Sequence, residues 1–225
     1  MTDYERAELN AFGEVFPEAE QKGCYFHFSQ CFYRHLQKSP EILNVFSTDS
    51  DFSLHLWNLV ALAFVPPEDV ISTFEMLMSE EFFIHNEVLL QEFLAYFEKT
   101  WLGPRNPRGI ARLAPLFAIP LWNCCHSVLE DLPKTNNSCE GFNSGFSTLL
   151  GASHPTIYKL IDGLKEQQVL TELSMNQRIA GNVPTPRKKI AIASKKLKTV
   201  VEQYGVGDFS HIDYLRQISY RVRFQ

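Results

Sequence analysis

The spacing of hydrophobic residues predicts helices over most of this chain. In several stretches apolar residues recur every three or four positions, which is the period of an amphipathic helix. The predicted helices cover residues 4–15, 29–37, 52–64, 69–78, 86–99, 115–128 and 154–177, with a short one near 188–203. A further helix begins at one of residues 135–138 and continues through Leu150. The run from Gly23 to Phe28 is the exception, because it is rich in aromatic residues and begins with glycine, and we interpret it as a short strand.

Residues 133–146 have the pattern of a loop that turns into a helix. Residues 135–138 all favour the N-cap position, and Glu140 then falls in the first turn, where the helix dipole favours a carboxylate. Gly141 and Gly145 each cost roughly 1 kcal/mol relative to alanine inside a helix. We therefore expect a sheet or a ligand to approach the backbone closely on that side.

Two faces of this predicted helix differ in chemistry. Phe142, Phe146, Leu149 and Leu150 form an apolar stripe, whereas Glu140 and Asn143 lie on another face, below Asn136 and Asn137. The simplest interpretation is a capped amphipathic helix with a solvated glutamate. The following helix has its own apolar positions, which we expect to be buried: Ile157, Leu160, Ile161, Leu164 and Leu170.

Composition and charge narrow the class of protein. The 225 residues are 45% hydrophobic and 21% charged, without an apolar run long enough to span a membrane. Residues 178–225 hold 10 of the 21 Lys and Arg residues but only 3 of the 26 Asp and Glu residues. The five cysteines are odd in number, and the first residues are unlike a signal peptide, so we expect reduced thiols and a nuclear or cytoplasmic, intracellular location.

The basic segment follows a proline-rich break, and we expect a partly disordered tail from about residue 179. Its candidate nucleic-acid-binding residues are Arg187, Lys188, Lys189, Lys195, Lys196 and Lys198. Such a segment can follow phosphates without reading sequence. A nuclear-import signal and a solvated tail without a partner are the alternatives.

Two groups of motifs resemble the transposase domain of Mutator-like elements (MULE). Residues 135–143 read Thr-Asn-Asn-x-x-Glu-x-Phe-Asn, which is similar to the closing motif of that family. Residues 1–5 read Met-Thr-Asp-Tyr-Glu, and residues 11–19 and 23–30 read Ala-Phe-x-x-x-Phe-Pro-x-Ala and Gly-Cys-x-Phe-His-Phe-x-Gln. These resemble the middle of the same domain, so the resemblance covers roughly residues 1–165.

The resemblance implies a fold and a chemistry. The fold is an α/β remnant, mostly helical: the C-terminal half of a ribonuclease H-like fold with an all-helical insertion. The implied segments are 1–39 (partial core), 40–130 (insertion), 131–178 (returning core helices) and 179–225 (basic tail). Asp3 and Glu140 match two of the three catalytic acids, which hold Mg²⁺ or Mn²⁺ for phosphodiester cleavage and strand transfer. Asn136, Asn137, Asn143 and His27 are supporting residues.

The first acid of the family has no counterpart, so we expect a truncated transposase fragment that is inactive alone. The alternative is a non-enzymatic helical module, derived from a transposase, that binds nucleic acid or protein. DNA is the partner that we expect, without a membrane, and homo-oligomerisation stays open.

Cys24 and His27 have the spacing of half a zinc site, which Cys124, Cys125 or His126 could complete. Residues three apart on a strand point to opposite faces, however. The favoured alternative is that Cys24 is packed and His27 is hydrogen-bonded near the acidic site.

Overall fold

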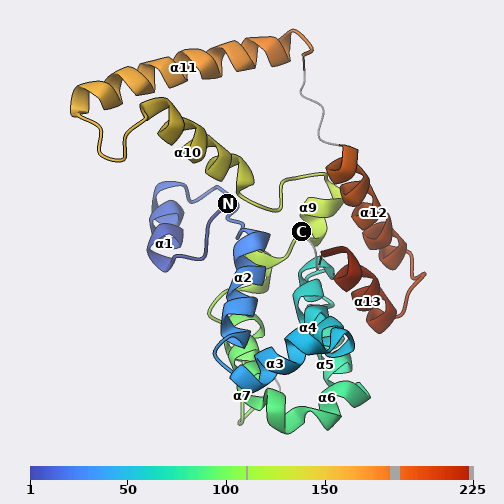
Figure 1. Ribbon diagram of the computed structural model, residues 1–225. Helices are drawn as coiled ribbons and strands as arrows, with labels where there is room; N and C mark the ends of the chain where they lie inside the picture. Colours follow the sequence, from blue (N-terminus) through green and yellow to red (C-terminus); the bar gives the residue numbers. More distant parts are fainter. Residues whose placement is uncertain (110, 183–187, 223–225) are drawn as a thin grey trace. The chain divides into compact units, whose positions relative to one another are not determined.

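The computed structural model describes residues 1–109, 111–182 and 188–222 as two compact units (Figure 1). The core unit comprises residues 1–135 and 192–225, and the hairpin unit comprises residues 136–191. The described residues are mainly helical, as the sequence predicts, and their β structure is limited to isolated bridges, Thr2 with Gly23 and Arg105 with Arg112.

The helices of the first half are α1 Arg6–Val15, α2 Tyr25–Leu36, α3 Pro40–Thr48, α4 Ser50–Ala61, α5 Val70–Met78, α6 Glu81–His85 and α7 Glu87–Phe97, with short turns η1 Leu62–Phe64 and η2 Glu98–Leu102. The helices of the second half are α8 Ile119–Trp122, α9 Cys125–Leu129, α10 Asn137–Leu150, α11 Ile157–Ile179, α12 Lys188–Gly205 and α13 His211–Val222. In the described part, we find no helix with the length and apolar character needed to cross a membrane.

Helix α4 lies at the centre of the core unit. The Asp49 carboxylate caps it by accepting from the backbone N–H groups of Asp51 and Phe52, at 2.8 and 3.1 Å. Eight of its residues are buried, namely Phe52, Ser53, Leu54, Leu56, Asn58, Leu59, Val60 and Ala61. A helix that is buried on most sides must be covered by neighbours all round.

Helix α13 supplies part of that cover, which corrects our expectation of a partly disordered tail for residues 211–222, whereas α12 confirms the short helix predicted near 188–203. Helix α13 packs mainly against α4, and its buried residues follow helical spacing: Tyr214, Leu215, Ile218, Ser219 and Val222. The Tyr214 hydroxyl donates to the Phe64 carbonyl at 2.6 Å, and the Ser219 hydroxyl donates to Asn58 Oδ1 at 2.7 Å. The basic composition of this segment indicated a tail, but the segment also carries an apolar stripe that packs into the core.

The strand predicted for Gly23–Phe28 is also wrong, because within it only Gly23 takes part in β structure, as an isolated bridge with Thr2. Helix α2 begins at Tyr25, and its buried residues Tyr25, Phe28, Phe32 and Leu36 follow the three-and-four spacing of one helix face. Aromatic residues favour strands in isolation. Here the burial of one continuous face against the core overrides that preference.

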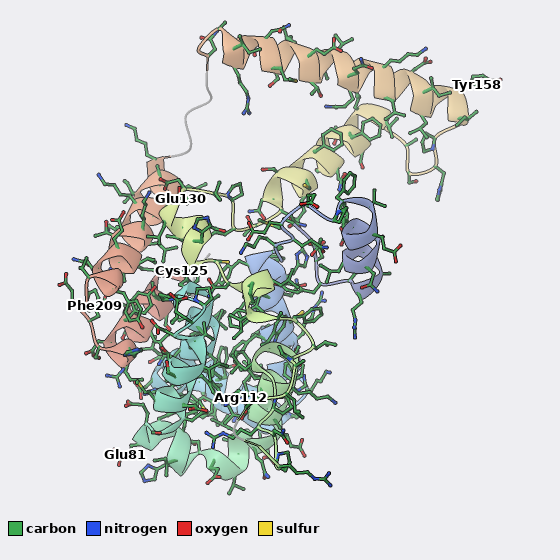
Figure 2. All side chains as sticks on the ribbon, turned by 180° about the vertical axis from the view of Figure 1, so that it is seen from behind. Glu81, Arg112, Cys125, Glu130, Tyr158 and Phe209 are labelled. Carbon is green, nitrogen blue, oxygen red and sulfur yellow. The ribbon has the colours of Figure 1, made fainter. Side chains whose placement is uncertain are left out.

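Helices α10 and α11 pack against each other in the hairpin unit (Figure 1). Both are present as predicted, but their apolar stripes are largely exposed. Leu150 is buried, whereas Phe142, Ile157, Ile161, Leu164 and Leu170 are 41–63% exposed. Tyr158, near the start of α11, projects from the end of the hairpin (Figure 2).

The expected close approach at Gly141 and Gly145 is absent within the described hairpin unit. A Cβ atom built at either position has no heavy atom within 4 Å. The close approach is at Gly163 of α11, where a Cβ would lie 2.6 Å from Leu150 Cδ2. Glycine at position 163 therefore allows α11 to pack closely on Leu150.

Replacement of Ile218 by alanine should destabilise the core unit strongly. Ile218 is fully buried on α13, so the change removes packed methyl groups and leaves a cavity, at a cost of about 2–5 kcal/mol. Urea unfolding measures this change. The matched control is Ile84→Ala in the same unit, since Ile84 is 60% exposed and should change stability by about 0.5 kcal/mol or less. Equal losses in both variants would contradict the packing of α13 into the core.

Candidate functional site

The segment that carries Asp3 is held beside the start of α2. The Thr2 N–H donates to the Lys22 carbonyl at 2.8 Å, and the Cys24 N–H donates to the Thr2 carbonyl at 2.9 Å. These bonds form the parallel bridge between Thr2 and Gly23, and helix α1 connects its two sides. Asp3 and Cys24 therefore follow directly after the paired residues.

Tyr4 anchors this segment in the core. Its ring lies edge-on to Trp101 and Phe117, with centroids 5.2 and 5.1 Å apart, and its backbone has a φ of 67°, which is unusual for a residue other than glycine. A Cβ atom at Gly23 would lie 2.3 Å from the Tyr4 ring, so position 23 requires glycine. The anchor fixes the position of the neighbouring Asp3.

Cys24 and His27 lie in the first turn of α2 and not on a strand. Cys24 is the N-cap residue and His27 follows three positions later, so both side chains lie on one side of the helix. Our argument that the pair points to opposite faces is therefore wrong. Cys24 is fully buried, and the side chains of His27 and Asp3 are 21% and 42% exposed.

Asp3, Cys24 and His27 meet at one point. One potential ligand atom from each lies within 4.8 Å of the other two, and this is the one group of three or more His, Cys, Asp or Glu residues found in the described part. His27 Nδ1 lies 3.0 Å from Asp3 Oδ1. The buried Nδ1 atom nevertheless forms no hydrogen bond with the described residues, because the contact lacks hydrogen-bond geometry.

The three residues considered as further zinc ligands do not join this group. The Cys124 thiol donates weakly to the Trp122 carbonyl, with sulfur 3.6 Å from oxygen. Burial raises the pKa of Cys124 to about 12 and that of Cys125 to about 11, so both stay protonated thiols at neutral pH. Figure 2 shows Cys125 among the side chains of the core unit, whereas His126 is exposed on α9.

Glu140 and its neighbouring amides lie on α10 of the hairpin unit. Asn136 is the N-cap residue, and Glu140 is exposed in the first turn, as the sequence predicts. Asn136, Asn137 and Asn143 stand three or four positions from Glu140 and therefore neighbour it on the helix surface. Asp3 belongs to the core unit and Glu140 to the hairpin unit, and the structure describes each unit by itself.

The predicted nucleic-acid-binding residues divide into two kinds. Arg187 lies outside the described residues. Lys188, Lys189, Lys195 and Lys196 are exposed on α12, whose buried residues are Leu197, Val200 and Val201. Lys198 instead donates to the Asp131 carboxylate, and this bond raises the pKa of Lys198.

Sequence reasoning did not connect Asp3 with Cys24, nor Lys198 with Asp131. The first had no local signal, because Asp3 and Cys24 are brought together by the bridge between Thr2 and Gly23. The second had none, because the two residues are 67 positions apart and meet only through packing.

Comparison with models of protein families, with curated proteins and with solved structures finds no match to this chain.

Thiol labelling should separate Cys139 from the other cysteines. Cys139 is exposed on α10, whereas Cys24, Cys124 and Cys125 are buried and Cys31 is partly buried. The thiolate is the reactive form, and burial raises the pKa of Cys31, Cys124 and Cys125. In mildly alkaline buffer, a disulfide reagent should titrate one thiol quickly and all five only after denaturation.

The variant Cys139→Ser provides the control, because it should lose the fast reaction and keep the other four thiols. Fast labelling of several thiols in the native protein would contradict the burial described for this site.

Proposed function

We propose that this chain carries part of the catalytic domain of a Mutator-like DNA transposase, with Asp3 and Glu140 as ligands of Mg²⁺ or Mn²⁺. The single observation that carries the proposal is the parallel pairing of Thr2 with Gly23 across helix α1. It adds a feature of tertiary structure to the motifs that resemble this family.

The pairing matters because parallel segments require a crossover connection, which is usually a helix. Here the bridged residues Thr2 and Gly23 are connected by helix α1, so each parallel segment contributes a single paired residue to the crossover. Ligands of such folds bind beyond the carboxyl ends of the strands. Asp3 follows Thr2 and Cys24 follows Gly23, so both stand at those ends.

The connection toward Glu140 begins at the same place. The Tyr25 N–H donates to the carbonyl of Lys134 at 2.8 Å, and the Gly23 N–H donates to the carbonyl of Leu121 at 2.7 Å. Lys134 precedes Glu140 by six residues in the sequence. Tyr25, the residue after Cys24, is thus hydrogen-bonded to the segment that precedes Glu140 in the sequence.

The chemistry of the proposal requires acids that hold divalent cations. Phosphodiester cleavage needs an activated oxygen nucleophile and a stabilised leaving oxygen, and two hard cations held by carboxylates supply both. Asp3 and Glu140 are both exposed and accessible to a cation. The asparagine neighbours of Glu140 would orient its carboxylate or contact the scissile phosphate.

Iron-mediated cleavage of the protein backbone tests whether Asp3 and Glu140 each bind a divalent cation. Fe²⁺ substitutes for Mg²⁺ at carboxylate sites, and with peroxide and ascorbate it cuts the chain only near the bound ion. We expect cuts near residue 3 and near residue 140, both suppressed by excess Mg²⁺ or Mn²⁺. Mass spectrometry of the fragments locates the cuts.

Three variants make this test decisive. Asp3→Asn should weaken the cut near residue 3 and Glu140→Gln the cut near residue 140, because each carboxylate holds the cation that directs that cut. Glu172→Gln is the control, since Glu172 is an exposed acid on α11 and should leave the cuts unchanged. Absence of the cut near residue 140, or its persistence in Glu140→Gln, would contradict the proposal.

A second observation favours DNA as the partner. The four exposed lysines of α12 span residues 188–196, about 12 Å along the helix axis, which corresponds to roughly three to four base steps of one DNA strand. Such a surface contacts phosphates without reading bases. We therefore propose that the exposed lysine face of α12 binds the DNA backbone.

Changing Lys188, Lys189, Lys195 and Lys196 together to glutamine should weaken DNA binding and reduce its salt dependence. Each lost phosphate contact lowers the slope of log K against log salt by about 0.9 for duplex DNA. Fluorescence anisotropy at several salt concentrations measures both effects. The matched control changes the exposed residues Lys38, Lys99, Lys159 and Lys165, which alters net charge equally. Equal effects of both sets would rule out a specific role for α12.

A further inference from the structure

We propose that Asp3, Cys24 and His27 form a three-ligand site for a transition-metal cation, zinc foremost, with water in the fourth position. The site lies within the core unit and uses no residue of the hairpin unit. It therefore does not depend on the proposed role of Glu140. Three protein ligands and one open position are the arrangement of zinc sites that bind a reacting molecule.

The distances fit a single small cation. Zinc bonds of about 2.0–2.3 Å in tetrahedral geometry place neighbouring ligand atoms roughly 3.3–3.8 Å apart. The three candidate ligand atoms all lie within 4.8 Å of one another, and the imidazole nitrogen of His27 is 3.0 Å from Asp3 Oδ1. Binding of one ion therefore requires these atoms to adjust to separations of roughly 3.3–3.8 Å.

The orientation of His27 also favours a shared cation over a simple hydrogen bond. The hydrogen or lone pair of Nδ1 lies in the plane of the ring. Despite the 3.0 Å contact, Nδ1 makes no hydrogen bond to the Asp3 carboxylate or to another described group, although the atom is buried. Two ligands of one metal lie this close to each other without a hydrogen bond between them.

The backbone holds the ligands in place before a cation arrives. The Cys24 N–H is bonded to the Thr2 carbonyl, and the Cys24 carbonyl accepts from the Phe28 N–H at 3.0 Å in the first turn of α2. The neighbouring Tyr4 is fixed between two aromatic rings. Cys24 forms the buried end of the site and Asp3 the exposed end, which provides an entry path from solvent.

The mixture of sulfur, nitrogen and oxygen determines the class of cation. Thiolate and imidazole ligands select zinc and similar transition metals, whereas Mg²⁺ prefers oxygen ligands alone. A carboxylate has two oxygens and can bridge two cations. Asp3 can therefore bind zinc together with Cys24 and His27 and still contribute to an Mg²⁺ site.

Titration of the whole, reduced protein with Co²⁺ in the absence of oxygen tests the site. Cobalt replaces zinc and reports its ligands by absorption. We expect one equivalent to give a thiolate-to-cobalt charge-transfer band and the strong visible bands of four-coordinate cobalt. Zn²⁺ should abolish both and excess Mg²⁺ should not. Lack of the thiolate band in the native protein would overturn the proposal.

Matched variants identify the ligands. Cys24→Ser should remove the charge-transfer band, and Cys139→Ser, at an exposed cysteine, should retain it. Asp3→Asn and His27→Ala should weaken Zn²⁺ binding by at least roughly 10–100-fold, since even the loss of a residue that only supports a ligand costs that much. A band that persists in Cys24→Ser, or zinc affinity unchanged in Asp3→Asn, would overturn the site.

Two features separate this test from that of the proposed function. Asp3 is at the surface, so the variant Asp3→Asn still tests the site if Cys24→Ser fails to fold. Circular dichroism verifies the fold of each variant. The cobalt bands report binding at Cys24, whereas the outcome of the iron experiment depends on the cut near residue 140. If one experiment gives a negative result, the other can still be interpreted.

Discussion

The core unit depends on covering helix α4. Because α4 has buried residues around most of its circumference, it cannot present a stable face to water, and helices from both ends of the chain must surround it. Helix α13 completes this cover and satisfies the buried amide of Asn58 through the Ser219 hydroxyl. Removal of such a partner would leave a buried polar group unpaired, which is expensive. The C-terminal segment is therefore part of the core, although its composition is that of a basic tail.

The candidate site is an extension of this core toward the surface. Beneath it, the Phe28 ring of α2 stacks on Trp122 with centroids 5.1 Å apart, and Trp101 contacts both Phe28 and Tyr4. These rings give α2 a fixed position, and Tyr4 then fixes Asp3. The positions of Asp3, Cys24 and His27 thus depend on the packing of these aromatic rings. Close-packed rings leave little freedom for the backbone that carries the three residues.

The two proposals assign complementary chemistry to one location. Hard cations held by carboxylates suit phosphodiester cleavage, whereas the thiolate of Cys24 and the imidazole of His27 suit a transition metal. Asp3 is the residue common to both. In the proposed function the exposed lysines of α12 bind the DNA backbone, whereas Lys198 is paired with Asp131.

The sequence by itself determined where most helices form, because the spacing of apolar residues is a local property with a fixed period. It indicated α4, α5, α7, α10 and α11 directly, but the six residues from Gly23 to Phe28 were too few to distinguish a helical period from an aromatic-rich strand. Only the tertiary structure decided which apolar faces are buried, so the stripe of α13 enters the core while those of α10 and α11 stay exposed. It also decided that Gly23 accommodates Tyr4 and that Asp3 meets Cys24 and His27. These contacts join residues from different segments, and they exist only once the whole core unit has packed.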